Sequence, residues 1–134
     1  MAADGLITIP SHYGTKDTTD RLDTAIKTKG LTVFARIDHA AGAAEAGLSL
    51  RPTELLIFGN ANGGTPLMQS NQTIGIDLPL RALVWQDAAG KTWLSYNDPS
   101  WRAKRHDLGS QVDPAITAMA AGVSAIAREA IGSS

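Results

Sequence analysis

The sequence predicts an α+β fold: a single-domain sandwich in which a mixed β-sheet of about five strands has helices packed on it. Segments with helical spacing alternate along the chain with segments rich in β-forming residues. Two of the β-rich segments, 76–87 and 91–96, flank Ala88-Ala89-Gly90, which predicts a hairpin. The length of 134 residues suits one domain, and no repeat or composition shift divides the chain, so we expect residues 1–134 to form a single domain.

The first third of the chain predicts two strands around an amphipathic helix. Residues 6–9 form a short apolar run that is ended by proline. Residues 15–29 have helical spacing, with acidic residues near the start, lysines near the end and Gly30 suited to the C-cap. Residues 31–38 alternate, which predicts a strand whose buried face carries Leu31, Val33, Ala35 and Ile37.

The middle of the chain predicts a short alanine-rich helix within 39–50 and then an inner strand over 53–58. A glycine-rich loop follows this strand. After the loop, Thr65 is expected as the N-cap and Pro66 as the first residue of a brief helix that continues to about Gln72.

Two proline-initiated helices complete the prediction. Asp98-Pro99 opens a short helix that ends near Leu108-Gly109. Asp113-Pro114 opens a longer one, in which apolar residues recur at helical spacing as far as Ile131.

Composition excludes several classes of function. The chain has no cysteine, which excludes disulfides, thiolate zinc sites and a cysteine nucleophile and suits a cytoplasmic location. A net charge of −1 argues against a nucleic-acid surface. No apolar run approaches ~18 residues and the N-terminus lacks the pattern of a secretory signal, so we expect no membrane span. The three histidines show no metal-ligand spacing, so no metal site is expected.

The stretch "FGNANGGTPLM", residues 58–68, is the strongest candidate for a binding site. Gly59, four residues and Gly64 approximate a phosphate loop, but Thr65-Pro66 stands where that loop needs lysine and a hydroxyl residue. A nucleotide triphosphatase is therefore rejected. Two readings remain: Asn60, Asn62, Gly64 and Thr65 hold a small polar or anionic ligand, or the glycines merely permit a tight connection.

Other polar groups lie at the predicted ends of strands. Asp38-His39 could form an acid/base pair, but it equally fits a turn-capping aspartate and a surface histidine. Tyr96 and Asp98 could join a site beside the hairpin, although Asp98 also suits a helix cap. The basic segment 102–106, which includes His106, is expected to be a solvated helix face.

With these segments assembled, the chain resembles the domain-of-unknown-function family numbered 302. The resemblance rests on residues 33–43, 50–69, 76–99 and 105–106, in that order. It implies a small α+β sandwich with a mixed sheet, usually a homodimer, and no assigned activity. One departure is Ala61, where family members commonly have proline. The implied signature positions are Asp38, His39, Phe58, Gly59, Asn60, Gly64, Thr65, Pro66, Asp77, Leu78, Pro79, Tyr96, Asp98 and His106.

Three hypotheses of function follow. The first is a homodimeric module that binds a small polar or anionic ligand at the loop 59–65. The second is a structural or protein-interaction domain with no small ligand. The third is a cofactor-free hydrolase or isomerase that pairs His39 or His106 with an aspartate. No cofactor is indicated. In the binding hypothesis, the candidate ligand-binding residues are Asp38, His39, Asn60, Asn62, Gly64, Thr65, Tyr96 and His106.

Overall fold

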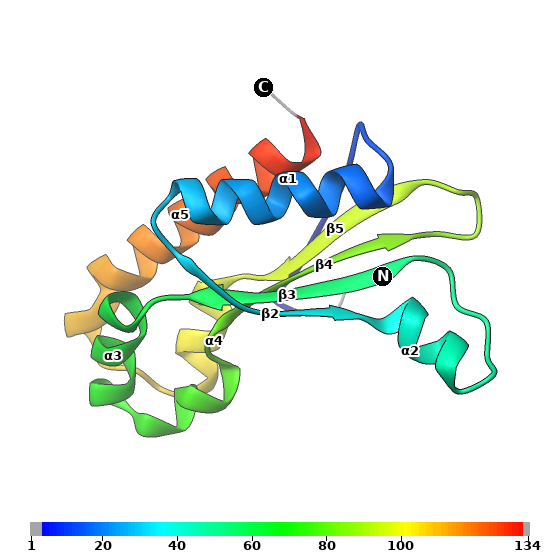
Figure 1. The fold of residues 1–134 in the computed structure, drawn as a ribbon. Coiled ribbons are helices and arrows are strands. Elements are labelled where there is room, and N and C mark those ends of the chain that lie inside the picture. Colours follow the sequence, from blue (N-terminus) through cyan, green and yellow to red (C-terminus); the bar gives the residue numbers. More distant parts are fainter. Residues whose placement is uncertain (1–3, 133–134) are drawn as a thin grey trace.

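A computed structural model describes residues 4–132 and confirms the α+β class, with one five-stranded sheet and helices packed on it (Figure 1). The strand order is β1-β5-β4-β3-β2. The strands are β1 (Leu6–Pro10), β2 (Thr32–Asp38), β3 (Thr53–Gly59), β4 (Leu80–Gln86) and β5 (Thr92–Asn97). All four pairings are antiparallel, so the sheet is not mixed as the alternation of helices and strands suggested.

The placement of the short helices explains the antiparallel sheet. Helix α2 (His39–Glu45) connects β2 to β3 at one end of the sheet. At the opposite end, helix α3 (Ala61–Ser70) and the 3₁₀ helix η1 (Gln72–Asp77) connect β3 to β4 (Figure 1). A connection that returns to the same end of the sheet leaves its strands antiparallel, whereas a parallel pair needs a crossover over the face.

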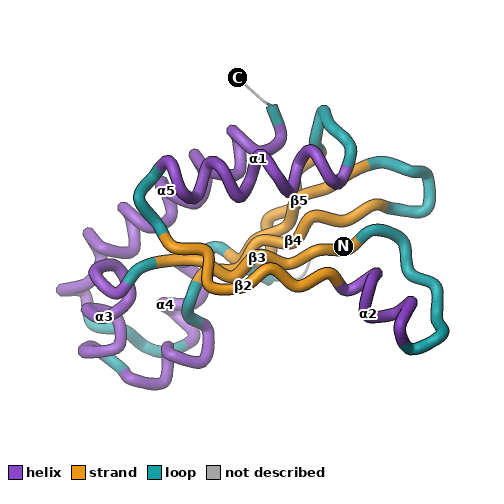
Figure 2. The backbone as a smooth tube through the Cα atoms, viewed as in Figure 1, coloured by secondary structure: helices purple, strands orange, loops and turns teal. Residues whose placement is uncertain are grey.

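Two long helices cover one face of the sheet. Helices α1 (Thr15–Thr28) and α5 (Asp113–Ile131) lie side by side there (Figure 2). Their apolar stripes pack against the inward side chains of β3, β4 and β5, where Leu56, Phe58 and Leu94 are fully buried. This layer is the main core. Helix α4 (Pro99–Arg105) and the 3₁₀ helix η2 (Ser110–Val112) lie between β5 and α5 in the chain.

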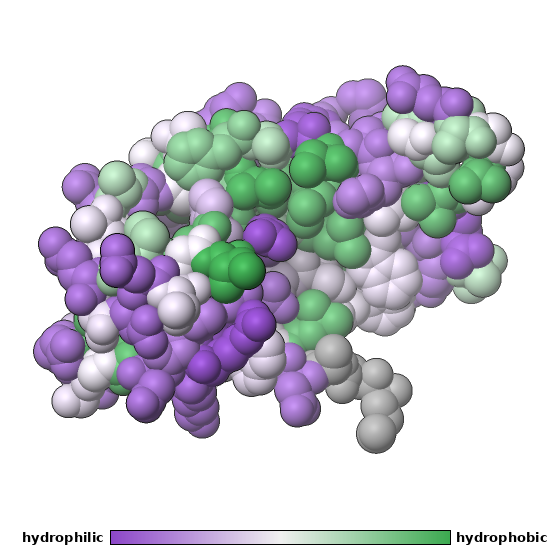
Figure 3. Space-filling model, turned by 90° about the horizontal axis from the view of Figure 1, so that it is seen from below, coloured by the Kyte–Doolittle hydropathy of each residue, from purple (hydrophilic) through white to green (hydrophobic). Residues whose placement is uncertain are grey.

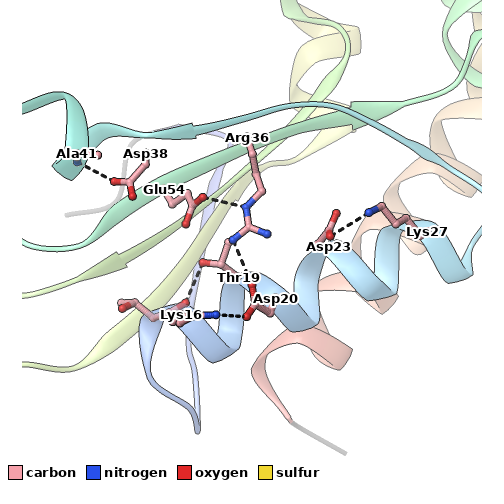
Figure 4. Close-up of polar contacts among 10 residues, drawn as sticks. Lys16, Thr19, Asp20, Asp23, Lys27, Arg36, Asp38, Ala41 and Glu54 are labelled. Atoms are coloured by element: carbon pink, nitrogen blue, oxygen red, sulfur yellow. Dashed lines mark hydrogen bonds and ion pairs between the residues drawn. The ribbon is translucent and has the colours of Figure 1, made fainter.

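A β-bulge in β2 changes the predicted alternation. The register with β3 shifts between Val33 and Ala35, so Phe34 is an extra, unpaired residue. Beyond the bulge Arg36 faces the helices, where it pairs with Asp20 at 3.2 Å and with Glu54 at 2.9 Å (Figure 4). The predicted buried face of alternate residues 31–37 is therefore wrong beyond Val33, because one inserted residue exchanges the two faces of a strand.

The opposite face of the sheet carries a row of apolar side chains. Ile37, Leu55 and Leu83 are directly paired across β2, β3 and β4 on this face. Ile37 is 39% exposed. Seen from this side, hydrophobic residues gather over the middle of the molecule (Figure 3).

Candidate binding cavity

A cavity of about 700 Å³ lies where α3 and α5 meet one end of the sheet. Its walls come from the end of β3, the first turns of α3, the η1–β4 connection and one side of α5. Most of the lining is apolar: Leu31, Phe34, Met68, Leu78, Pro79, Leu80, Met119, Val123 and Ile126 are joined by small residues. An apolar space of this size can hold a small organic molecule.

Four of the predicted site residues line this cavity: Asn60, Asn62, Gly64 and Thr65. The glycine-rich stretch is not a loop, however. Its residues 61–65 form the first turns of α3, and the helix begins after Asn60 rather than at Thr65. Thr65 as the N-cap is therefore wrong, because an asparagine five residues earlier already caps the first turn.

The first turn of α3 leaves backbone donors beside the cavity. The side-chain oxygen of Asn60 accepts from the N–H of Gly63 at 2.7 Å, and its carbonyl accepts from Gly64 at 3.1 Å. The N–H groups of Ala61 and Asn62 precede any intrahelical acceptor. Pro66 lies inside the helix and has no N–H, so the carbonyl of Asn62 receives no bond from residue 66.

The residues that both line the cavity and are exposed define what we call the mouth. They include polar and charged groups at the start of α3 and the end of α1, together with a single aromatic ring. The mouth consists of Lys29, Phe34, Asn60, Ala61, Asn62, Thr65 and Ala118.

Sequence reasoning missed the α5 wall, which is made of small residues. A Cβ atom added to Gly122 would meet no heavy atom within 4 Å, so the cavity is open beside this glycine. Ala115 and Ala118 lie on the same wall. The available signal was Gly122 itself, because glycine inside a helix costs stability and calls for a reason.

The remaining predicted residues do not reach the cavity. Asp38 is the N-cap of α2, where its side chain accepts from the N–H of Ala41 at 2.9 Å, and His39 is exposed at the first position of that helix. Helix α2 lies at the opposite end of the sheet from the cavity (Figure 1). Tyr96 is 7% exposed and belongs to the main core.

His106 forms a separate, nearly buried network at the end of α4. Its Nε2 lies 2.5 Å from Asp77 Oδ2 and its Nδ1 lies 2.9 Å from Thr73 Oγ1. The Asp77 carboxylate accepts, so His106 donates from Nε2, while the bond between Nδ1 and the Thr73 hydroxyl runs in the direction that the tautomer sets. Both ring nitrogens are therefore engaged in hydrogen bonds inside the protein.

Asp77 is the carboxylate centre of this network. Arg105 donates to both of its oxygens, at 3.0 and 2.8 Å. Partial burial would raise the pKa of Asp77, but the His106 hydrogen bond and the Arg105 charge outweigh it and hold the pKa below its ordinary value.

The basic segment 102–106 is not simply a solvated helix face, as its composition suggested. Arg102 is only 2% exposed and His106 only 8%, because α4 packs between η1 and α5. Burial lowers the pKa of Arg102. The helix turns these two side chains inward and leaves Lys104 and Arg105 exposed.

Two features are absent from the part of the chain that the structure describes. Within residues 4–132, no group of three or more histidine, aspartate or glutamate side chains is arranged to hold a metal ion. Within the same range, no helix combines the length and apolar character needed to cross a membrane.

Comparison with known proteins identifies a family and a solved structure that resemble this chain. Residues 7–126 match the family model described as Domain of unknown function DUF302. A crystal structure of an uncharacterized conserved DUF302 protein from Bacillus stearothermophilus has the same fold, with a TM-score of 0.84. The match covers 96% of this chain and 99% of that one, at 19% sequence identity.

Curated relatives carry a different kind of name. "Fluoride-specific ion channel FluC 1" of Brucella suis and a protein of that name in Brucella abortus are each 52% identical to this chain over 128 residues. The match covers 96% of this chain but 50% and 47% of those proteins. The chain therefore spans about half the length of these relatives.

Proposed function

The chain belongs to the DUF302 family, and we propose that it is a binding module for a small amphipathic molecule. The observation that carries this proposal is the cavity of about 700 Å³ between α3 and α5. Ligand sites in proteins are typically of this size, mostly apolar, and supplied with a few polar groups that orient the ligand.

The lining indicates how such a molecule would lie. Its apolar body would occupy the space among Leu78, Met119 and Ile126, where water finds few partners. Its polar end would lie at the mouth, near the Gly59–Thr65 stretch for which the sequence predicted a polar or anionic ligand. The apolar depth of the cavity thus narrows that prediction to molecules with a hydrocarbon part.

The arrangement gives a hydrolase or isomerase little support. His39 and His106 lie at opposite ends of the sheet, and both ring nitrogens of His106 are already engaged in hydrogen bonds with Thr73 and Asp77. A general base needs a free lone pair within reach of the substrate. We therefore favour binding over catalysis.

Probe titration tests the proposal. The uncharged fluorescent probe N-phenyl-1-naphthylamine should bind the wild type saturably. Gly122→Trp places a large ring in the open space beside α5 and should abolish binding, while the matched control Gly122→Ala should retain it. Circular dichroism melts establish that both variants fold. Equal binding by folded Gly122→Trp and wild type would refute the cavity as the site.

Protein association is a second candidate function, favoured by the apolar row of Ile37, Leu55 and Leu83 on the uncovered sheet face. Half-exposed apolar rows of this kind mark interaction surfaces. We propose that this face forms the homodimer expected from the sequence. Sedimentation should show a dimer for the wild type and a monomer for Leu83→Lys; a dimer in both would exclude this face.

The channel-named relatives suggest a further partner. Since they share only about half their length with this chain, we propose that the chain associates with a membrane channel supplied by the other half or by a separate protein. The remaining half of the Brucella suis relative, purified in detergent, should co-elute with this chain in size-exclusion chromatography. Separate elution would refute the association. A cytoplasmic location likewise stays a prediction.

A further inference from the structure

The charge of the cavity lining is unbalanced. Among the described residues 4–132 that line the cavity, Lys29 is the only charged one and none is a carboxylate. It lies at the C-cap of α1 and is exposed, so it belongs to the mouth rather than the apolar depth. A polar ligand group that lies at the mouth is therefore close to one formal charge, the positive charge of Lys29.

Lys29 also has no carboxylate of its own among residues 4–132. Two residues earlier on the same helix, Lys27 pairs with Asp23 at 3.1 Å (Figure 4). Lys16 pairs with Asp20 at 2.7 Å in the first turns. Lys27 already supplies the basic residue that stabilises the last turn of α1, so Lys29 is available to interact with a group outside the protein.

The start of α3 adds donors to the same mouth. Ala61 and Asn62 line the cavity, and their backbone N–H groups lie in the first turn, before any intrahelical acceptor is available. The positive end of the α3 dipole lies at this same first turn. Lys29 and these backbone donors favour a ligand group that accepts hydrogen bonds and carries negative charge.

We propose that the ligand is an organic anion, a hydrocarbon body with a carboxylate or comparable acidic head, and that Lys29 holds the head at the mouth. This inference rests on the proposed function, because it requires the cavity to bind the hydrocarbon part. A ligand of this class satisfies both halves of the lining: the apolar depth takes the hydrocarbon, and the mouth takes the charge.

Head-group selectivity is the test. Decanoate, decan-1-ol and decylammonium have matched chains, and each can displace the uncharged probe N-phenyl-1-naphthylamine. For the wild type, decanoate should bind about 10-fold more tightly than decan-1-ol, a difference of about 1.4 kcal/mol. Decylammonium should bind most weakly, and the preference for decanoate should shrink as salt is added.

Variants of two lysines test whether the preference for decanoate over decan-1-ol depends on Lys29. Lys29→Gln should bring the ratio of the decanoate and decan-1-ol affinities close to one. Lys27→Gln, on the same helix but outside the cavity lining, should keep the full preference. A preference for decanoate that survives in Lys29→Gln would overturn the assignment of Lys29.

The two proposals fail in different ways. If the wild type binds decanoate and decan-1-ol equally, and Gly122→Trp blocks both, the cavity is the site but its ligand is not selected by charge. If none of the three compounds displaces the probe, or if Gly122→Trp binds them as the wild type does, the binding function itself fails.

Discussion

At the scale of single residues, the nearly buried histidine is a structural group. His106 has a hydrogen-bond partner at each ring nitrogen, and Asp77 accepts from both His106 and Arg105. The sequence placed His106 among candidate ligand-binding residues because histidine and aspartate can form acid/base pairs. It could not show that Thr73, thirty-three positions away, would occupy the other nitrogen.

Asp77→Asn should destabilise the protein by about 1 to 3 kcal/mol at pH 7, since it leaves His106 without its charged partner. The pKa of Asp77 is lowered in the folded state, so its contribution is present above the ordinary value of 3.8 and is lost as pH falls below that value. Urea denaturation of wild type and variant at pH 7 and pH 3 measures this.

The difference in free energy of unfolding between the wild type and Asp77→Asn should therefore be smaller at pH 3 than at pH 7. Asp23→Asn, which removes a single exposed pair with Lys27, serves as the control and should change stability by less than about 0.5 kcal/mol. A difference between Asp77→Asn and wild type that is unchanged at pH 3 would refute the role assigned to the carboxylate.

Phe34 should matter to binding more than to folding. It is 55% exposed in the free protein, and it is the aromatic ring at the cavity mouth. A ligand that covers this ring buries apolar surface, so Phe34→Ala should weaken probe binding about 10-fold. Its free energy of unfolding should change by less than about 0.5 kcal/mol.

The control for Phe34 is Ile76→Ala, which removes a side chain that is 70% exposed and lies outside the cavity lining. Probe titrations compare the affinities of both variants with that of the wild type. Equal affinity for Phe34→Ala and wild type would place the ligand away from β2.

At the scale of elements, sequence patterns predicted most of the helices and strands but misjudged two local features. Residues 61–64 have two glycines and an asparagine, which disfavour a helix, yet α3 includes them because Asn60 caps its first turn and the rest of the helix packs through Leu67. The β2 bulge was equally hidden, since Phe34 fits a regular alternation and only pairing with β3 shows the extra residue.

Asn60→Ala should therefore shorten α3 and lower stability by about 0.5 to 2 kcal/mol, because it removes the cap on the N–H of Gly63. Asn62→Ala is the matched control: it lies two residues later in the same turn, and its exposed side chain caps no helix. Thermal melts followed by circular dichroism compare the two. If both variants melt with the wild type, the helix does not depend on this cap.

At the scale of the whole molecule, the fold class, the single sheet of five strands and the order of the elements were all predictable from periodicity. The antiparallel pairing was not, because the sequence does not show whether a short helix crosses the face of a sheet or lies at its end. The cavity was predictable only in part. Asn60 and Gly64 were found as a polar, glycine-rich stretch, whereas Gly122 and Ala115 join them only once α5 packs beside α3.

Gly122→Ala should stabilise the whole domain by up to about 1 kcal/mol, since alanine is the better helix former and its Cβ meets open space. The melting temperature should rise by several degrees while probe binding is retained. A lower melting temperature would mean that the space beside Gly122 is filled in solution.

The decisive measurement for a ligand in the cavity is a methyl NMR titration of ¹³C-methionine-labelled protein with decanoate. Met68 and Met119 both line the cavity, and Trp85, Trp93 and Trp101 lie outside it. The methyl signals of Met68 and Met119 should both shift to saturation while the three indole N–H signals stay in place. Saturable binding that moves the indole signals and leaves Met68 and Met119 unchanged would contradict it.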